Sequence, residues 1–276
     1  MALNYYKNEL KENAQLLASK GKGILAVDES TKTVGKRLAG IGVENTEDNR
    51  KAYRGMLFTT EGLGKYISGA ILFEETLYQN HQDGESMVKK LNDLGIIPGI
   101  KVDKGLNPLP GGGDVETFCS GLDGLVERAA KYYEQGARFA KWRAVLQITN
   151  DGCPSKLSIQ ENAWGLARYA RSVQESGLVP IIEPEILMDG DHTIEKTAEV
   201  QEEVIKQVYS ACQANGVFLE GTLLKPSMTV NGADCPTKAD PMKVAEMTIR
   251  TMERCVPASV PGIVFLSGGL SEEAAS

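Results

Sequence analysis

Seven short apolar segments recur at nearly even intervals along the chain and restrict its architecture more than any other pattern. Each has the length of a β-strand and is bounded by Gly, Pro or Asp residues, and their first residues lie 31 to 45 residues apart. They cover residues 23–28, 66–73, 97–103, 139–146, 178–185, 217–226 and 262–268. Connections of that length leave room for a helix between successive strands.

The connections show the periodicity of helices. Ser158 and Glu161 resemble a capping box, which predicts that one of these helices begins near residue 162. Strand–helix alternation predicts a mainly parallel sheet with right-handed crossovers. The expected helices cover residues 48–62, 87–95, 122–136, 162–175, 200–215 and 241–255.

Two α/β architectures fit this order, an open doubly wound sheet and a (β/α)8 barrel. The first strand–helix turn lacks both GxGxxG and GxxxxGK[ST], so dinucleotide-binding and P-loop interpretations lose support. Charged residues occur at similar positions within most segments, which favours a barrel whose strand ends surround one site. We expect a single (β/α)8 TIM-barrel domain over residues 1–276. Only seven of the eight strands are present, and we expect a sequence truncated after strand seven, inside a helix that starts at Ser271.

Composition excludes several function classes. The 30 basic and 37 acidic residues give a net charge of −7, which disfavours a nucleic-acid partner. No apolar run approaches the length of a membrane span, and two histidines disfavour a His-rich metal site. Five cysteines without a CxxC pair are typical of a reducing compartment, and the N-terminus lacks the apolar core of a secretion signal. We therefore expect a cytoplasmic protein.

Charged side chains lie inside the predicted strands, where an unpaired buried charge would cost several kcal/mol. Residues two apart on a strand face the same side, so three pairs share a face: Lys101 with Asp103, Lys141 with Arg143, and Glu183 with Glu185. Asp28 ends the first segment, and Glu220 and Lys225 lie in the sixth at an odd spacing. Such a set is typical of a polar active site, and the alternative is a structural ion-pair network.

These residues favour a reaction in which a lysine amine is the nucleophile. We find no Ser, His or Cys triad, Asp189–His192 lacks the rest of a calcium loop, and Gly111–Gly113 is interpreted as a flexible loop rather than a phosphate cradle. A lysine close to other cations loses affinity for its proton, and its neutral amine can attack a carbonyl to form an imine. Lys225, at the end of a buried strand, is the best candidate; the alternative is a lysine that extends its amine to solvent.

Two loops suggest phosphate binding. The sequence from Ser267 to Gly269 ends the seventh segment and leads into a helix, whose first N–H groups suit an anion. Ser30 to Thr33, followed by Lys36 and Arg37, is a second donor-rich loop after the first segment. It can equally be an ordinary helix cap with a solvated basic turn.

These residues belong to six ordered blocks that closely resemble the class I, or Schiff-base, fructose-1,6-bisphosphate aldolases. The most specific is VFLEGTLLKPS at residues 217–227, which is similar to the imine-lysine signature of that family. The resemblance begins near Leu10 and runs to the last residue. The other blocks are ILAVDES at 24–30, GIKVDKG at 99–105, FAKWR at 139–143, PIIEPE at 180–185 and FLSGG at 265–269.

The resemblance implies a catalytic set. Lys225 would form the imine with the C2 carbonyl of the ketose, Glu183 would shuttle protons, and Glu185 would tune both groups. Asp28 would assist loss of the C4 hydroxyl proton as the C3–C4 bond breaks, and Lys141 would stabilise the developing charge. The residues implied in substrate binding are Lys101, Ser30 and Thr33 at one phosphate, Ser267, Gly268, Gly269 and Arg37 at the other, and Arg143 beside the fourth strand.

The implied reaction is the reversible cleavage of fructose 1,6-bisphosphate into two triose phosphates. It needs no cofactor or metal, and a homotetramer without nucleic-acid or membrane partners is expected by analogy. The family continues past Ser276 with an eighth strand that carries a phosphate-binding arginine, so we expect an open barrel and weakened cleavage if the chain ends there.

Alternatives remain open at this point. They are another imine-forming lyase or transaldolase acting on a sugar phosphate, a non-catalytic sugar-phosphate-binding fragment, and a metal-dependent aldolase. Two separate phosphate loops favour the bisphosphate. A plastid location would replace the cytoplasmic one if a transit peptide were missing.

Overall fold

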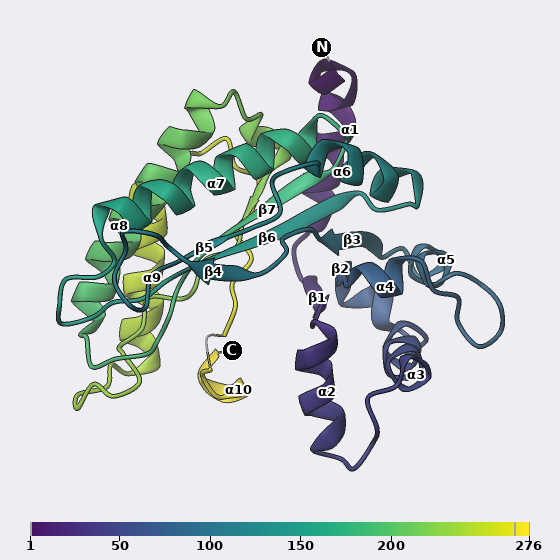
Figure 1. The fold of residues 1–276 in the computed structure, drawn as a ribbon, viewed down its shortest axis with the longest axis horizontal. Helices are drawn as coiled ribbons and strands as arrows, with labels where there is room; N and C mark the ends of the chain where they lie inside the picture. The colour runs from purple at the N-terminus through teal and green to yellow at the C-terminus, as the bar shows by residue number, and fades with distance from the viewer. Residues whose placement is uncertain (1, 268, 276) are drawn as a thin grey trace.

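The structure, a computed structural model, describes residues 2–267 and 269–275 and contains a curled parallel sheet (Figure 1). Neighbouring strands in the sheet follow one another along the chain, in the order β1-β2-β3-β6-β7-β8. This arrangement is a half-barrel, and it confirms the predicted barrel-type α/β fold. The strands are β1 Gly23–Val27, β2 Ile67–Leu72, β3 Ile97–Lys101, β6 Phe139–Leu146, β7 Val179–Ile186 and β8 Leu223–Leu224.

The last two predicted strands differ from expectation. In the sixth segment only Leu223 and Leu224 pair with β7, while the 3-10 helix η2 (Leu219–Gly221) precedes them. The prediction that Glu220 lies in a strand is wrong, because it sits exposed in η2. The seventh segment forms single parallel bridges, from Ile263 to Leu224 and from Leu266 to Ser227.

Helices fill the connections, and side-chain caps set where most of them begin. The helix predicted to begin near residue 162 starts earlier than expected, because Ser155 rather than Ser158 accepts the capping hydrogen bond. Figure 1 shows α7, α8 and α9 along one side of the sheet and α2 to α5 grouped beside β1 to β3. The helices are α1 Ala2–Leu17, α2 Thr31–Ala39, α3 Glu47–Phe58, α4 Glu74–Leu77, α5 Met87–Asp93, α6 Leu125–Glu134, α7 Lys156–Gln174, α8 Ile194–Ala214, α9 Pro241–Cys255 and α10 Glu272–Ala275, with the 3-10 helix η1 at Leu63–Lys65.

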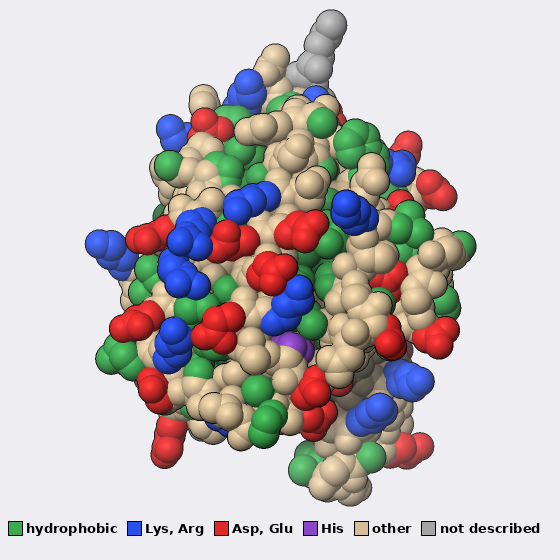
Figure 2. Space-filling view, turned by 90° about the vertical axis from the view of Figure 1, so that its left-hand side faces the viewer, with side chains coloured by type: hydrophobic (Ala, Val, Ile, Leu, Met, Phe, Trp, Pro, Cys, Tyr) green, Lys and Arg blue, Asp and Glu red, His purple; other side chains and the backbone are tan. Residues whose placement is uncertain are grey.

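The outer surface of these helices carries charges of both signs. Figure 2 shows basic and acidic side chains interspersed over the side of the molecule where α8 and α9 lie. Ion pairs account for several of them, such as Glu202 with Arg254 at 2.9 Å and with Lys206 at 3.0 Å. This face is therefore a solvated, internally paired surface.

A small antiparallel hairpin was not predicted. Strands β4 (Leu106–Pro108) and β5 (Thr117–Cys119) pair in the connection between β3 and α6. Each has only three residues, which is too short for an alternating pattern to stand out in the sequence.

The helix α1 closes one end of the half-barrel. Its Leu10 and Leu17 pack in one buried cluster with Phe139 and Val179, the first residues of β6 and β7. The Phe139 ring occupies space that two strand residues leave free by being glycine. A Cβ on Gly99 would lie 2.2 Å from that ring, and one on Gly69 would lie 3.0 Å from it. The starts of β2, β3, β6 and β7 are therefore closely packed around the Phe139 ring.

We predict that Gly99→Ala destabilises the protein by roughly 1–3 kcal/mol, because the added methyl overlaps the Phe139 ring. Urea unfolding measures the change. Gly23→Ala is the matched control, since a Cβ there meets nothing within 4 Å in another strand of the same sheet. Equal stability of the two variants would show that the Phe139 ring does not need the space that Gly99 leaves.

Candidate active site

The charged residues predicted from the strands come together inside the half-barrel. Asp28 directly follows β1, Lys141 lies in β6, Glu183 lies in β7, and Lys225 directly follows β8. The Lys141 Nζ atom lies 3.0 Å from Asp28 Oδ2 and 3.0 Å from Glu183 Oε2. The Lys225 Nζ donates a short hydrogen bond to Glu183 Oε1. One carboxylate thus contacts two lysines from two different strands.

Burial makes these contacts strong. The side chains of Glu183 and Lys141 are 2% and 7% exposed. Burial by itself would lower the pKa of Lys141, but the charges of Asp28 and Glu183 outweigh it and raise the pKa above the ordinary lysine value. Lys141 is therefore a fixed cation between two carboxylates, and it can stabilise negative charge on either side.

Lys225 borders open space. A cavity of about 340 Å³ is lined by apolar side chains, including Ile71 of β2 and Ile181 of β7, together with two lysines, Lys22 and Lys225. The Lys225 side chain is partly exposed, whereas Glu183 behind it is buried. A small molecule in this space would reach the amine from one side while the carboxylate contacts it from the other.

A second pair of strand charges lies next to the first. The Arg143 Nε donates to Glu185 Oε2 in a short ion pair. Burial would lower the pKa of Arg143, but this hydrogen bond and the surrounding carboxylates raise it. The Lys101 Nζ donates to Asp103 Oδ1 at 2.5 Å, and the Asp103 side chain is buried. All three predicted same-face pairs are thus in the site region, with Glu183 and Glu185 facing basic partners on β6.

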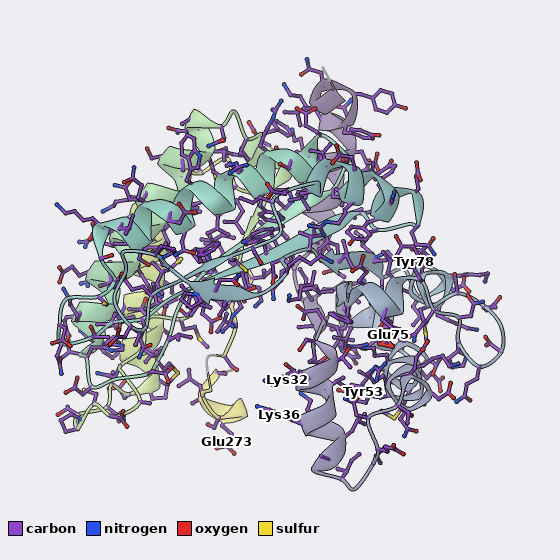
Figure 3. All side chains as sticks on the ribbon, in the orientation of Figure 1. Lys32, Lys36, Tyr53, Glu75, Tyr78 and Glu273 are labelled. Carbon is purple, nitrogen blue, oxygen red and sulfur yellow. The ribbon has the colours of Figure 1, made fainter. Side chains whose placement is uncertain are left out.

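The loop after β1 forms a helix cap. The Ser30 Oγ atom accepts from the Thr33 N–H at 3.3 Å and lies 3.0 Å from Thr33 Oγ1 at the start of α2. The Arg37 side chain is 60% exposed, and its Nη1 lies 2.7 Å from Glu29 Oε1. Figure 3 shows Lys32 and Lys36 extending from α2 toward the side on which Glu273 of α10 lies. Lys32 and Lys36 therefore point toward the segment that contains α10.

The other predicted phosphate loop is only partly described. Ser267 is exposed, and its carbonyl accepts from the Leu270 N–H at 3.1 Å. Gly269 has a φ of +93°, a left-handed conformation that favours glycine. Ser271 caps α10 by accepting from the Ala274 N–H, as its sequence position suggested. The predicted contact at Gly268 lies outside the described residues.

Glu116 closes the glycine-rich loop at residues 111–113. It accepts hydrogen bonds from the Gly113 N–H at 3.0 Å, from the Ser155 N–H at 2.5 Å and from Ser155 Oγ at 2.8 Å. Burial by itself would raise the pKa of Glu116, but these hydrogen bonds outweigh burial and lower the pKa below its usual value. The Gly113 N–H of this loop therefore donates to a protein carboxylate rather than to a phosphate.

The Asp189–His192 stretch, which lacks the rest of a calcium loop in the sequence, lies in a polar connection. It joins β7 to α8, and His192 is buried there while Asp191 accepts from Asn150 at 3.3 Å. Within residues 2–267 and 269–275, no group of three or more His, Cys, Asp or Glu side chains could hold a metal ion. No helix in the same ranges is long and apolar enough to cross a membrane.

Arg54 is a buried residue that the sequence patterns did not indicate. It lies in α3 with 0% of its side chain exposed, and its Nη2 donates to the Glu29 carbonyl at 2.6 Å. Burial lowers the pKa of Arg54, and the charges of Glu29 and Glu75 oppose this shift. Figure 3 labels Glu75 of α4, which also pairs with Arg50 at 2.8 Å. Arg54 thereby fixes the backbone between Asp28 and Ser30.

Comparisons with known proteins point to one family. The family model described as fructose-bisphosphate aldolase class-I matches residues 9–276. Fructose-bisphosphate aldolase 3, chloroplastic, of Arabidopsis thaliana is 58% identical over 98% of this chain and 68% of its own length. Fructose-bisphosphate aldolase 1 of Toxoplasma gondii is 59% identical over 97% of this chain and 74% of its own. A crystal structure of the Plasmodium falciparum aldolase with TRAP and a small-molecule inhibitor superposes with a TM-score of 0.96 at 55% identity, covering 98% of this chain and 78% of that one.

The lowered pKa of Glu116 predicts an acid-dependent contribution to stability. A carboxylate whose pKa is depressed on folding stabilises the protein above its unfolded pKa of about 4.5, and the contribution disappears as pH falls through the folded value. We expect Glu116→Gln to cost about 1–3 kcal/mol at pH 7 and progressively less below pH 4.5.

Urea unfolding of the parent protein and the variant at several pH values measures this difference. Asp114→Asn, which changes an exposed acid of the same loop, is the control and should show no such pH dependence. A cost of Glu116→Gln that stays constant from pH 7 to pH 3.5 would contradict the assignment.

Proposed function

Because this chain belongs to the class-I fructose-bisphosphate aldolase family, we propose that the buried cluster of Asp28, Lys141, Glu183 and Lys225 performs its chemistry. The enzyme is a lyase that reversibly cleaves D-fructose 1,6-bisphosphate to glycerone phosphate and D-glyceraldehyde 3-phosphate, the aldol step of glycolysis and gluconeogenesis. The observation that carries the residue assignment is that Glu183 contacts both lysines.

Imine formation is assigned to Lys225 and Glu183. Glu183 takes a proton from the Lys225 ammonium, and the neutral amine attacks the C2 carbonyl to give a carbinolamine. Glu183 then returns the proton to the hydroxyl that leaves as water, so a protonated imine forms and the carboxylate is regenerated. The short Lys225–Glu183 contact supports this direct transfer.

Carbon–carbon cleavage is assigned to Asp28 and Lys141. Asp28 accepts the proton of the C4 hydroxyl, the C3–C4 bond breaks, and its electron pair moves to the iminium to form an enamine. Lys141 lies 3.0 Å from carboxylate oxygens of Asp28 and Glu183, so its charge supports both groups as their protonation changes. Protonation and hydrolysis of the enamine then release glycerone phosphate.

Substrate binding is assigned to the rim of the half-barrel. Lys101 with Ser30 and Thr33 is proposed to hold one phosphate, and the 267–269 loop with Arg37 the other. We propose that Glu185 orients Arg143, since their ion pair joins the ends of β6 and β7. Two separate proposed phosphate positions support a bisphosphate substrate over a transaldolase monophosphate.

Assembly, domain organisation and location are further parts of this proposal. We propose a homotetramer, to which the exposed Leu157 and Trp164 of α7 could contribute contact area, and one barrel-type unit over residues 1–276. Light scattering of the purified protein tests the tetramer. The cytoplasmic location predicted from composition gains no support from the Arabidopsis relative, which is named chloroplastic, so we propose the plastid alternative. Imaging of a fluorescent fusion of the complete gene product tests it.

We predict that borohydride reduction in the presence of glycerone phosphate attaches the triose to Lys225, because reduction converts the imine to a stable amine. Mass spectrometry of the proteolysed protein locates the adduct. Lys225→Met should give no adduct and no cleavage, while a chelator should leave the parent activity unchanged. Lys22→Met is the matched control, because Lys22 lines the same cavity and donates to the Gly64 carbonyl.

Glu183→Gln is predicted to lower kcat by roughly 10²- to 10⁴-fold, because Gln cannot relay the proton. The kcat from steady-state kinetics and the rate of adduct formation should fall by a similar factor. Binding of the bisphosphate without any adduct in the parent protein would instead favour a non-catalytic binding role, and cleavage by Lys225→Met would refute the imine mechanism.

A further inference from the structure

The backbone that carries Lys225 receives little support from the sheet. Strand β8 pairs with β7 over two residues only, Leu223 and Leu224. The Lys225 N–H donates to the Ile182 carbonyl at 2.8 Å, and on the other edge only single bridges join Leu224 to Ile263 and Ser227 to Leu266. Contacts from outside the sheet therefore add support at the position of Lys225.

Gln201, in the middle of α8, supplies such contacts. Its side chain is buried, and its Nε2 donates to the Ser227 carbonyl at 2.9 Å and to Ser227 Oγ at 3.1 Å. The same Ser227 Oγ accepts from the Ile186 N–H at 3.3 Å. One hydroxyl thus joins the end of β7 to the segment that follows Lys225, and Gln201 holds that hydroxyl in place.

Two threonines orient the Gln201 amide. Thr229 Oγ1 donates to Gln201 Oε1 at 2.6 Å, so the amide nitrogen must face Ser227. The Thr229 N–H in turn donates to Thr248 Oγ1 of α9 at 2.9 Å. Every side chain in this network is buried, and a broken bond would leave a polar group without a partner. The network therefore has a single satisfied arrangement.

We infer that Gln201 is a positioning residue for Lys225, acting through Ser227 to hold the ends of β7 and β8 together. Glu183 lies three residues before Ile186 on β7, and Lys225 lies two residues before Ser227, so the network spans both partners of the proton transfer. The inference rests on the proposed role of Lys225 as the imine-forming residue. A shift of about 1 Å between reacting groups can cost on the order of 10²-fold in rate.

The test is Gln201→Met, which keeps the length of the side chain and removes its hydrogen bonds. We expect kcat to fall roughly tenfold with KM for the bisphosphate nearly unchanged, because the proposed phosphate contacts lie elsewhere. The rate of borohydride-trapped imine formation should fall in the same proportion. Gln201→Glu should behave alike when its carboxylate is ionised, since it can then accept from Thr229 but cannot donate to Ser227. Gln207→Met is the control, because Gln207 is an exposed glutamine of the same helix.

Counting active sites by saturating borohydride labelling separates positioning from loss of folded protein. If Gln201→Met lowers only the melting temperature and forms the imine at the rate of Gln207→Met, the inference is wrong. If the parent protein itself forms no adduct, the proposed function is refuted instead. If Gln201→Met does not fold, Thr229→Val keeps the side-chain shape and removes the 2.6 Å bond. We then expect a fall in kcat of about threefold, and an unchanged kcat would overturn the inference.

Discussion

The contact of one buried carboxylate with two ammonium groups is the interaction on which the rest of the structure depends. Glu183 lies on β7, Lys141 on β6 and Lys225 at the end of β8, so their distances are set by how these three strands pair. A buried ion pair is favourable only when its partners stay in place, because a charge left alone inside the protein is costly. Strand register and the electrostatics of the candidate site are thus one constraint.

The sequence patterns that predicted the site are those with a simple spatial period. Residues two apart on a strand face the same side, so Lys141 with Arg143 and Glu183 with Glu185 could be placed together before any contact was known. The spacing of the apolar segments similarly predicted a parallel sheet, because a helix must fill each connection. Both predictions depend only on geometry that every strand shares, and both agree with the structure.

Features that depend on a particular tertiary contact could not be predicted in this way. Ser155 and Ser158 are equally good caps in the sequence, and only the backbone conformation decides that Ser155 is the N-cap of α7. Glu220 follows an apolar residue in a strand-like segment, yet the chain forms a 3-10 turn there. Arg54 and Gln201 resemble ordinary polar residues of surface helices, and nothing in their spacing shows that both are buried against loops of the site.

Strand β6 alternates between two environments along its length. Its even-numbered residues from Ala140 to Leu146 belong to the core beneath the helices, where Trp142 stacks on Tyr169. Its first three odd-numbered residues differ in order, with the Phe139 ring in the apolar cluster, the Lys141 ammonium beside Asp28 and the Arg143 guanidinium beside Glu185. Along this one strand, the side chains thus change from an aromatic ring to charged groups. The Phe139 ring therefore limits how far the polar part of the interior extends toward the starts of the strands.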